Sequence, residues 1–248
     1  MENCRHAVDF DWADSRVMRM AKRLLPATMF GTYRASKKPS QSFYTCSEAH
    51  ATVKYEDVRP RADDGRAAIV ELRGTKADGA IGMQSMIAGL HPSGEHVELL
   101  DGELGHDDTL PRRVSLLAVA SLLLLHLPDR GFRHDEGRLP AAGFLMKDSG
   151  LAEDETIDLC EALADATGND VGDVRLVVGT TALRLRAGQK VSGRTALAKL
   201  IGDDGKAVLT RIREWLKPDG SASDDVVNRC ADFPLLIMQR VPSRCRRC

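Results

Sequence analysis

The sequence predicts an α+β protein, in which a strand-rich first part is followed by a helical second part. Two observations lead to this class. Short runs of β-branched and aromatic residues, separated by turn residues, recur up to about residue 100. From about residue 112, most segments instead carry apolar residues at helical spacing. We therefore expect a first domain at 1–108, a helical module at 109–217 and a linker or tail at 218–248.

Composition narrows the classes of function. The chain contains 43% hydrophobic and 29% charged residues, as an ordinary globular protein does. Its 35 Lys and Arg nearly balance its 36 Asp and Glu, so a nucleic-acid contact must use a local basic patch. Aromatic residues make up 4%, which argues against a base-stacking platform. The apolar run 114–127 is too short to cross a bilayer and no signal peptide precedes it, so we expect a cytoplasmic protein without a membrane partner.

The segment 8–11 (VDFD) is the most informative stretch of the first domain. On an extended backbone residues i and i+2 face the same side, which predicts that Asp9 and Asp11 lie together. Two carboxylates this close repel each other, and a hard divalent cation between them relieves the repulsion. The alternative is that Asp11 caps the next helix and Asp9 is a surface charge. That helix is expected between an N-cap at Asp14 and Pro26, and a strand followed by a helix suggests an α/β unit.

The segment 34–41 combines three cations with hydroxyl and amide side chains. Such groups can hold a polyphosphate, although an exposed loop explains the same composition. Strands are predicted next at 42–46, 51–55, 67–74 and 96–100, and a Pro-Ser-Gly turn before the last of them predicts a hairpin or tight corner.

The third of these strands carries Glu71 beside Arg73, where a salt bridge between the two is the simpler interpretation.

In the second part, 114–127 is predicted to be a buried helix because it is apolar all round and rich in leucine. Further helical segments are expected at 139–146, 153–166, 171–187, 195–201 and 206–216. Cys245 and Cys248 are the only cysteines with metal-ligand spacing. Because no second such pair exists, a basic tail explains them better than a zinc site.

Taken together, these segments resemble the archaeo-eukaryotic primase superfamily, specifically the phage- and plasmid-type bifunctional primase–polymerase domain. The resemblance covers about residues 5–216 and includes the helical module, which is similar to the one that follows this catalytic domain. The family's hhhDhD strand is similar to 6–11, and its FGR-x-S-K-P-x-S-H-x-x-Y segment is similar to 30–31 with 34–37 and 40–44. Its (D/E)-h-R-G strand is similar to 71–74. Its Q-T-x-x-P-x-S-x-H-P-S-G-E stretch is similar to Gln84-Ser85 with 91–95.

The resemblance implies a primase–polymerase-like (RRM-like) catalytic sheet with flanking helices, followed by an all-α module. It implies a DNA primase and polymerase of a mobile genetic element, a nucleotidyltransferase that joins an NTP or dNTP to a primer 3′-hydroxyl in DNA replication. Two Mg²⁺ or Mn²⁺ ions would be the cofactors. The implied site residues are Asp9, Asp11 and Glu71 for catalysis and metal binding, Arg34, Ser36, Lys37, Ser40 and Gln41 for the nucleotide, and Arg73 and His91 for orientation or the template.

The expected partners are single-stranded or primed DNA and the nucleotide. A replicative helicase would be encoded elsewhere, because the chain has no Walker A loop.

Three departures from the family pattern keep alternatives open. Gln41 stands where the family has a histidine, and a glutamine carries no positive charge. Ala88 stands where a proline is expected. The first metal strand begins near residue 5, so the resemblance implies that a segment before it is missing. The alternatives are a catalytically impaired remnant that binds nucleic acid or nucleotide, and a metal-dependent nuclease, against which the basic segment argues.

Overall fold

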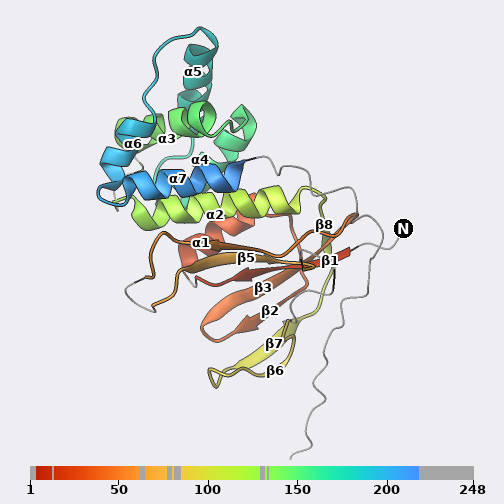
Figure 1. The fold of residues 1–248 in the computed structure, drawn as a ribbon. Coiled ribbons are helices and arrows are strands. Elements are labelled where there is room, and N and C mark those ends of the chain that lie inside the picture. Colours follow the sequence, from red (N-terminus) through yellow and green to blue (C-terminus); the bar gives the residue numbers. More distant parts are fainter. Residues whose placement is uncertain are drawn as a thin grey trace, which may run out of the picture.

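A computed structural model describes residues 4–12, 14–61, 65–76, 80, 85–128, 132 and 134–217. Gln84, Arg133 and the tail 218–248, with Cys245 and Cys248, lie outside the described residues. Within them the protein is an α+β fold, as expected, with an eight-stranded sheet and seven α-helices (Figure 1).

The strands form one sheet in the order β4-β5-β1-β3-β2-β7-β6, and β8 pairs with β3. The β3–β8 pairing is parallel and the other pairings are antiparallel. The strands are β1 (Cys4–Phe10), β2 (Gly31–Arg34), β3 (Lys37–Cys46), β4 (Val53–Glu56), β5 (Ala68–Arg73), β6 (Gly89–Leu90), β7 (His96–Leu100) and β8 (Gly105–His106).

One helix follows β1 and the others follow the sheet. They are α1 (Ser15–Leu24), α2 (Leu110–His126), α3 (Leu139–Gly143), α4 (Glu153–Ala166), α5 (Val174–Arg186), α6 (Arg194–Ile201) and α7 (Gly205–Leu216), with π-helical turns at η1 (His134–Arg138) and η2 (Phe144–Asp148). The predicted helices are thus confirmed to within a few residues. None of the helices in the described part of the chain combines the length and the apolar character needed to cross a bilayer.

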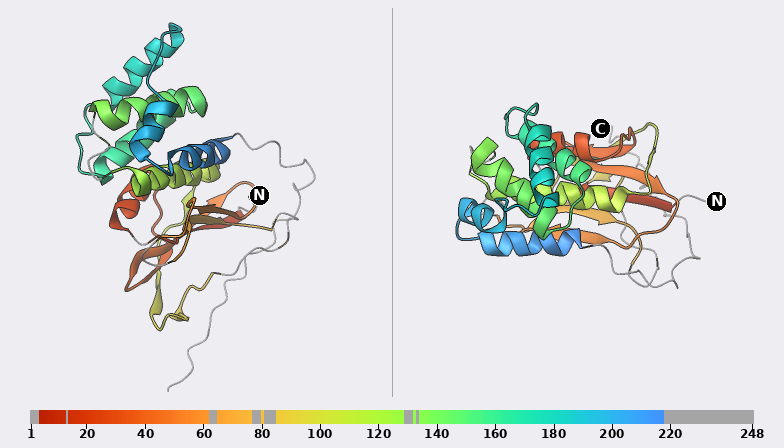
Figure 2. Two further views of the ribbon diagram at one scale, coloured as in Figure 1. Left: turned by 60° about the vertical axis from the view of Figure 1, so that its left-hand side comes forward. Right: turned by 90° about the horizontal axis from the view of Figure 1, so that it is seen from above.

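The helices gather on one face of the sheet (Figures 1 and 2). Val8 and Phe10 of β1 and Leu72 of β5 pack with α1 and α2 in the main hydrophobic core. On the other face, Ala7 and Phe43 belong to a small separate cluster. Because side chains alternate along a strand, residue 9 faces away from the helices together with residue 7.

Helix α1 forms where its sequence predicts it. The Asp14 side chain accepts a hydrogen bond from the Arg16 amide at 2.7 Å, which caps the amino end. Val17, Met20 and Leu24 are buried at helical spacing against the sheet and α2.

The basic segment 34–41 is not a loop. Residues up to Arg34 belong to β2 and those from Lys37 onward to β3, so only Ala35 and Ser36 make the turn of a hairpin. The two strands approach closely at Gly31, where a Cβ atom would lie 2.5 Å from the carbonyl oxygen of Gln41. A larger residue there would push β2 away from β3.

Candidate functional site

Three neighbouring strands bring the predicted carboxylates together. Asp9 of β1 is the direct cross-strand partner of Glu71 in β5 and of Gln41 in β3. Cross-strand partners project to the same side of a sheet, which here is the side away from the helices. Asp11 follows the end of β1 and is close enough that the charges of Asp9 and Glu71 raise its pKa.

Arg73 lies between two of these carboxylates. Its Nη2 is 2.5 Å from Oδ2 of Asp9, and its Nε donates to Oε2 of Glu71 at 2.9 Å. Gln41 Nε2 donates to the same Asp9 oxygen at 3.2 Å. The salt bridge expected between Arg73 and Glu71 is therefore present and extends to Asp9, so one guanidinium neutralises two buried carboxylates.

Asp11 is not neutralised in this way. Its Oδ2 is buried and has no hydrogen-bond partner in the described part of the chain. Burial raises the pKa of Asp11 and the charge of Asp9 raises it further, while Lys37 and Arg73 partly oppose this. A buried acceptor without a donor is costly, and a cation beside it would remove that cost.

The donor set fits a divalent metal ion only in part. No group of three or more His, Cys, Asp or Glu side chains within the described ranges is arranged to hold a metal. Arg73 lies between Asp9 and Glu71 and contacts both. The unpartnered oxygen of Asp11 and the adjacent Asp9 are nevertheless hard oxygen ligands of the kind that Mg²⁺ and Mn²⁺ take. Asp9 and Asp11 could hold such an ion, and Glu71 could join them where Arg73 releases it.

Lys37 reaches the carboxylates from the β2–β3 hairpin. Its Nζ donates to the carbonyl oxygen of Phe10, between Asp9 and Asp11 in the chain, at 2.5 Å. Burial lowers the pKa of Lys37, and the two aspartates raise it in opposition. The ammonium is thus held at the edge of the carboxylate cluster.

A second contact joins the hairpin turn to the loop 91–95. Glu95 accepts hydrogen bonds from the amide and the hydroxyl of Ser36, each at 2.8 Å, and from the hydroxyl of Ser93 at 3.2 Å. These hydrogen bonds from Ser36 lower the pKa of Glu95. Arg34 is part of the same contact, since its Nη1 lies 3.6 Å from Oε2 of Glu95.

His91 completes the contact with Arg34. Its Nδ1 accepts from the Ser93 amide at 3.1 Å and lies 3.1 Å from Nη1 of Arg34. Burial and the charge of Arg34 lower the pKa of His91, which favours the neutral ring that accepts these hydrogen bonds. The predicted corner is confirmed as the β6–β7 hairpin, where Gly94 has a φ of +86°.

Ser40 was expected to bind the nucleotide, but its hydroxyl is buried and pairs with that of Thr32 at 2.9 Å. Thr32 carries no signal in the sequence, because only the strand register brings it to Ser40. Glu95 is not among the predicted site residues, although it belongs to the H-P-S-G-E stretch. That stretch was the available signal.

Comparisons of the chain with protein-family models, with curated proteins and with solved structures gave no match. The primase resemblance therefore remains a prediction that rests on the residues quoted for it.

Proposed function

We propose that the chain is a metal-dependent nucleotidyltransferase of the DNA primase–polymerase type. One observation carries the proposal. The strands that carry the carboxylates and the basic segment 34–41 lie next to each other in the same sheet, and Lys37 is close to Asp9 and Asp11. A nuclease needs the carboxylates alone, whereas a polymerase needs carboxylates beside cations that hold a triphosphate.

Each group has a distinct part in the proposed reaction. Asp9, Asp11 and Glu71 would hold divalent ions, which lower the pKa of the primer 3′-hydroxyl and neutralise charge on the nucleotide phosphates. Lys37 and Arg34 would bind the phosphates of the incoming nucleotide. Glu95 keeps Arg34 and the Ser36 turn in place through the contacts described above.

Arg73 supports a second candidate, a remnant that binds nucleic acid or nucleotide without polymerising it. Its guanidinium already neutralises Asp9 and Glu71, which lowers their demand for a metal. Gln41 donates a hydrogen bond to Asp9, and its neutral side chain offers no positive charge to bind a phosphate. These contacts favour binding without catalysis unless Arg73 moves when metal and nucleotide arrive.

Primer extension separates these functions. Purified protein is incubated with primed and unprimed single-stranded DNA, ribo- or deoxyribonucleotides and Mn²⁺ or Mg²⁺. The control is Asp9→Asn/Asp11→Asn, which keeps side-chain size and removes the ligand charges. We expect extended products with the wild type and a loss of at least about a hundredfold in the control. DNA binding without products would support the remnant, and shortened DNA would support a nuclease.

A further inference from the structure

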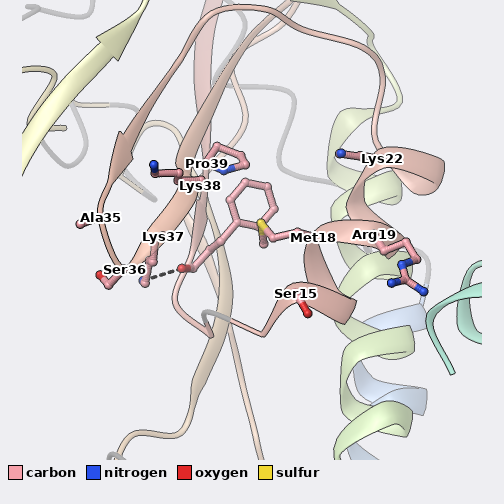
Figure 3. A pocket seen from close by; sticks show the side chains of 10 residues that line it. Ser15, Met18, Arg19, Lys22, Ala35, Ser36, Lys37, Lys38 and Pro39 are labelled. Carbon is pink, nitrogen blue, oxygen red and sulfur yellow. Dashed lines mark hydrogen bonds between the residues drawn. The ribbon is translucent and has the colours of Figure 1, made fainter.

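A cavity with a volume of ≈ 470 Å³ opens between α1 and the turn of the β2–β3 hairpin (Figure 3). Its lining includes four basic residues, Arg19, Lys22, Lys37 and Lys38, and no carboxylate among the residues that the structure describes. Apolar surface is supplied by Phe10, among others. The volume lies in the range of ligand pockets, and the lining suits an anion that also carries apolar groups.

On the α1 side of the cavity, two basic residues have no acidic partner in the described ranges. Arg19 and Lys22 are exposed, and with Ser15 they occupy positions i, i+4 and i+7 on one face of the helix. Arg19 makes one hydrogen bond, to the carbonyl oxygen of Asp165 at 3.1 Å. Lys22 has no hydrogen bond or ion pair within the described residues.

The other two cations of α1 differ. Arg16 pairs with Asp14 at 2.7 Å and Arg23 with Glu161 at 2.6 Å. In the described part of the chain neither Arg19 nor Lys22 has an acidic partner, and the Arg19 side chain extends from α1 away from the hairpin (Figure 3).

The hairpin side adds Lys37 and Lys38, whose ammonium lies 5.5 Å from the centre of the Tyr33 ring. Burial lowers the pKa of Lys37, and the charges of Asp9 and Asp11 oppose this. Lys22 on α1 and Lys38 on the hairpin add positive charge from the two sides of the cavity, which would attract an anionic ligand.

The cavity lies across β1 from the carboxylates. Phe10 lines it, whereas Asp9, the residue before Phe10, projects to the opposite face, and Asp11 is close enough to feel the charge of Asp9. Ser36 of the hairpin turn and Lys37, the first residue of β3, belong to both the cavity and the candidate site. A nucleotide held in the cavity would have its phosphates on the side of β1 away from the carboxylates, where phosphoryl transfer could not occur. A DNA strand, by contrast, is long enough to pass around the hairpin turn from one side of β1 to the other.

We propose that this cavity binds backbone phosphates of single-stranded DNA and holds the strand at a distance from the carboxylates. The choice of DNA rests on the function proposed above. A free nucleoside triphosphate offers the same phosphate chemistry, so the experiment must distinguish these two sources.

The test is Arg19→Gln/Lys22→Gln, which neutralises two exposed charges of α1. Binding of fluorescein-labelled oligothymidylate is measured by anisotropy over a KCl series, with EDTA and without nucleotides. We expect the Kd to rise on the order of tenfold. The slope of log K against log salt should become shallower by about 1.4, since each lost phosphate contact on a single strand contributes about 0.7.

The matched control is Arg184→Gln/Lys199→Gln, which removes the same charges from exposed positions on α5 and α6 and should retain the wild-type slope. An unchanged slope in the Arg19/Lys22 variant would overturn the proposal. So would an unchanged oligonucleotide Kd combined with weaker binding of a fluorescent deoxynucleoside triphosphate, because the cavity would then serve free nucleotide.

The outcome is independent of catalysis. The assay contains neither metal nor nucleotide, so its result does not depend on whether Asp9 and Asp11 support catalysis. The wild type could extend no primer while the salt dependence of the Arg19/Lys22 variant is shallower, as predicted. The cavity would then be supported as a binding site for single-stranded DNA, and only the polymerase proposal would fail.

Discussion

At the scale of single residues, Arg73 controls the charge of the carboxylate cluster. It is bonded to Asp9 and Glu71, whose side chains are 11% and 7% exposed. Removing one partner from a buried ion pair leaves uncompensated charge, which typically costs 3–5 kcal/mol. We predict that Arg73→Gln lowers the free energy of unfolding by about 3 kcal/mol in metal-free buffer.

The same variant should respond more strongly to metal. Mn²⁺ then meets carboxylates that no guanidinium neutralises, so it should restore part of the lost stability and stabilise the variant more than the wild type. Urea denaturation with and without Mn²⁺ measures both effects. The exposed Arg213→Gln is the matched control and should stay within about 0.5 kcal/mol of the wild type. Equal stabilisation of the variant and the wild type by Mn²⁺ would contradict a competition between Arg73 and the metal.

Asp11 gives a prediction with a pH dependence. Burial, and then the charge of Asp9, raise its pKa in the folded state. The fold therefore favours protonated Asp11, and this contribution to stability is lost as the pH rises through the raised pKa. Asp11→Asn avoids the loss, so at pH 7 without metal it should be more stable than the wild type, on the order of 1 kcal/mol.

This gain should disappear below the ordinary pKa of an aspartate, where Asp11 is protonated in both states. Saturating Mn²⁺ should reverse the order of stability at pH 7, because only the wild type keeps both aspartates as ligands. Thermal denaturation across pH, with and without Mn²⁺, measures each of these. If the wild type is more stable than the variant in EDTA at pH 7, the ionised Asp11 side chain does not destabilise the fold and the prediction is wrong.

At the scale of elements, the contact between the β2–β3 turn and the β6–β7 loop depends on Glu95. Glu95→Gln removes the charge that accepts from Ser36 and faces Arg34. We predict that the Ser36 amide then exchanges its hydrogen at least about tenfold faster, as seen by NMR, because the turn opens more often. Glu98→Gln removes a neighbouring carboxylate that binds Tyr33 instead, and should leave the Ser36 amide protected.

The pKa of Glu95 fixes how this contact responds to acid. Because hydrogen bonds from Ser36 lower that pKa, the contact stabilises the fold above the ordinary pKa of a glutamate. Its contribution should be lost only as the pH falls through the lowered value. Loss of Ser36 protection at a pH above the ordinary range would contradict this assignment.

Some elements could be predicted from the sequence because their signals are local. Helix α1 has its cap, its apolar spacing and its terminating proline within a few residues of chain. The β2–β3 hairpin could not be predicted from the sequence, because its basic composition fits a loop equally well. Its strands are defined by pairing with β1 and β7. For the same reason the pairing of Asp9 with Gln41 and Glu71 could not be predicted from local signals, since it depends on the order of strands in the sheet.

At the scale of the whole molecule, one hydrophobic core joins the sheet to the helical module. Helix α2 contacts β5 of the sheet as well as the helices α1, α4 and α7. Tyr55, next to the end of β4, packs edge-to-face on Trp215 of α7, with ring centres 5.2 Å apart. Because this core is shared, we expect the described part of the chain to unfold as one unit.

His126, at the end of α2, ties the two parts together. Its Nε2 lies 2.6 Å from Asp57, which follows β4, and its Nδ1 lies 3.6 Å from Asp204, which precedes α7. Burial alone would raise the pKa of Asp57, but the hydrogen bond and charge of His126 lower it. His126→Ala should destabilise the protein by about 3 kcal/mol, because it leaves Asp57 buried without its partner.

The double variant His126→Ala/Asp57→Ala should be less destabilised than His126→Ala, since it buries no unpaired carboxylate. Far-UV circular dichroism and tryptophan fluorescence during urea unfolding should give coincident transitions for all three proteins, and both should shift together in the variants. Two separate transitions, with only the helical signal moved by His126→Ala, would mean that the module beginning near residue 109 folds independently of the sheet. In that case the shared core would not couple the helices to the carboxylate site, and changes in the helical module should leave metal binding at Asp9 and Asp11 unaffected.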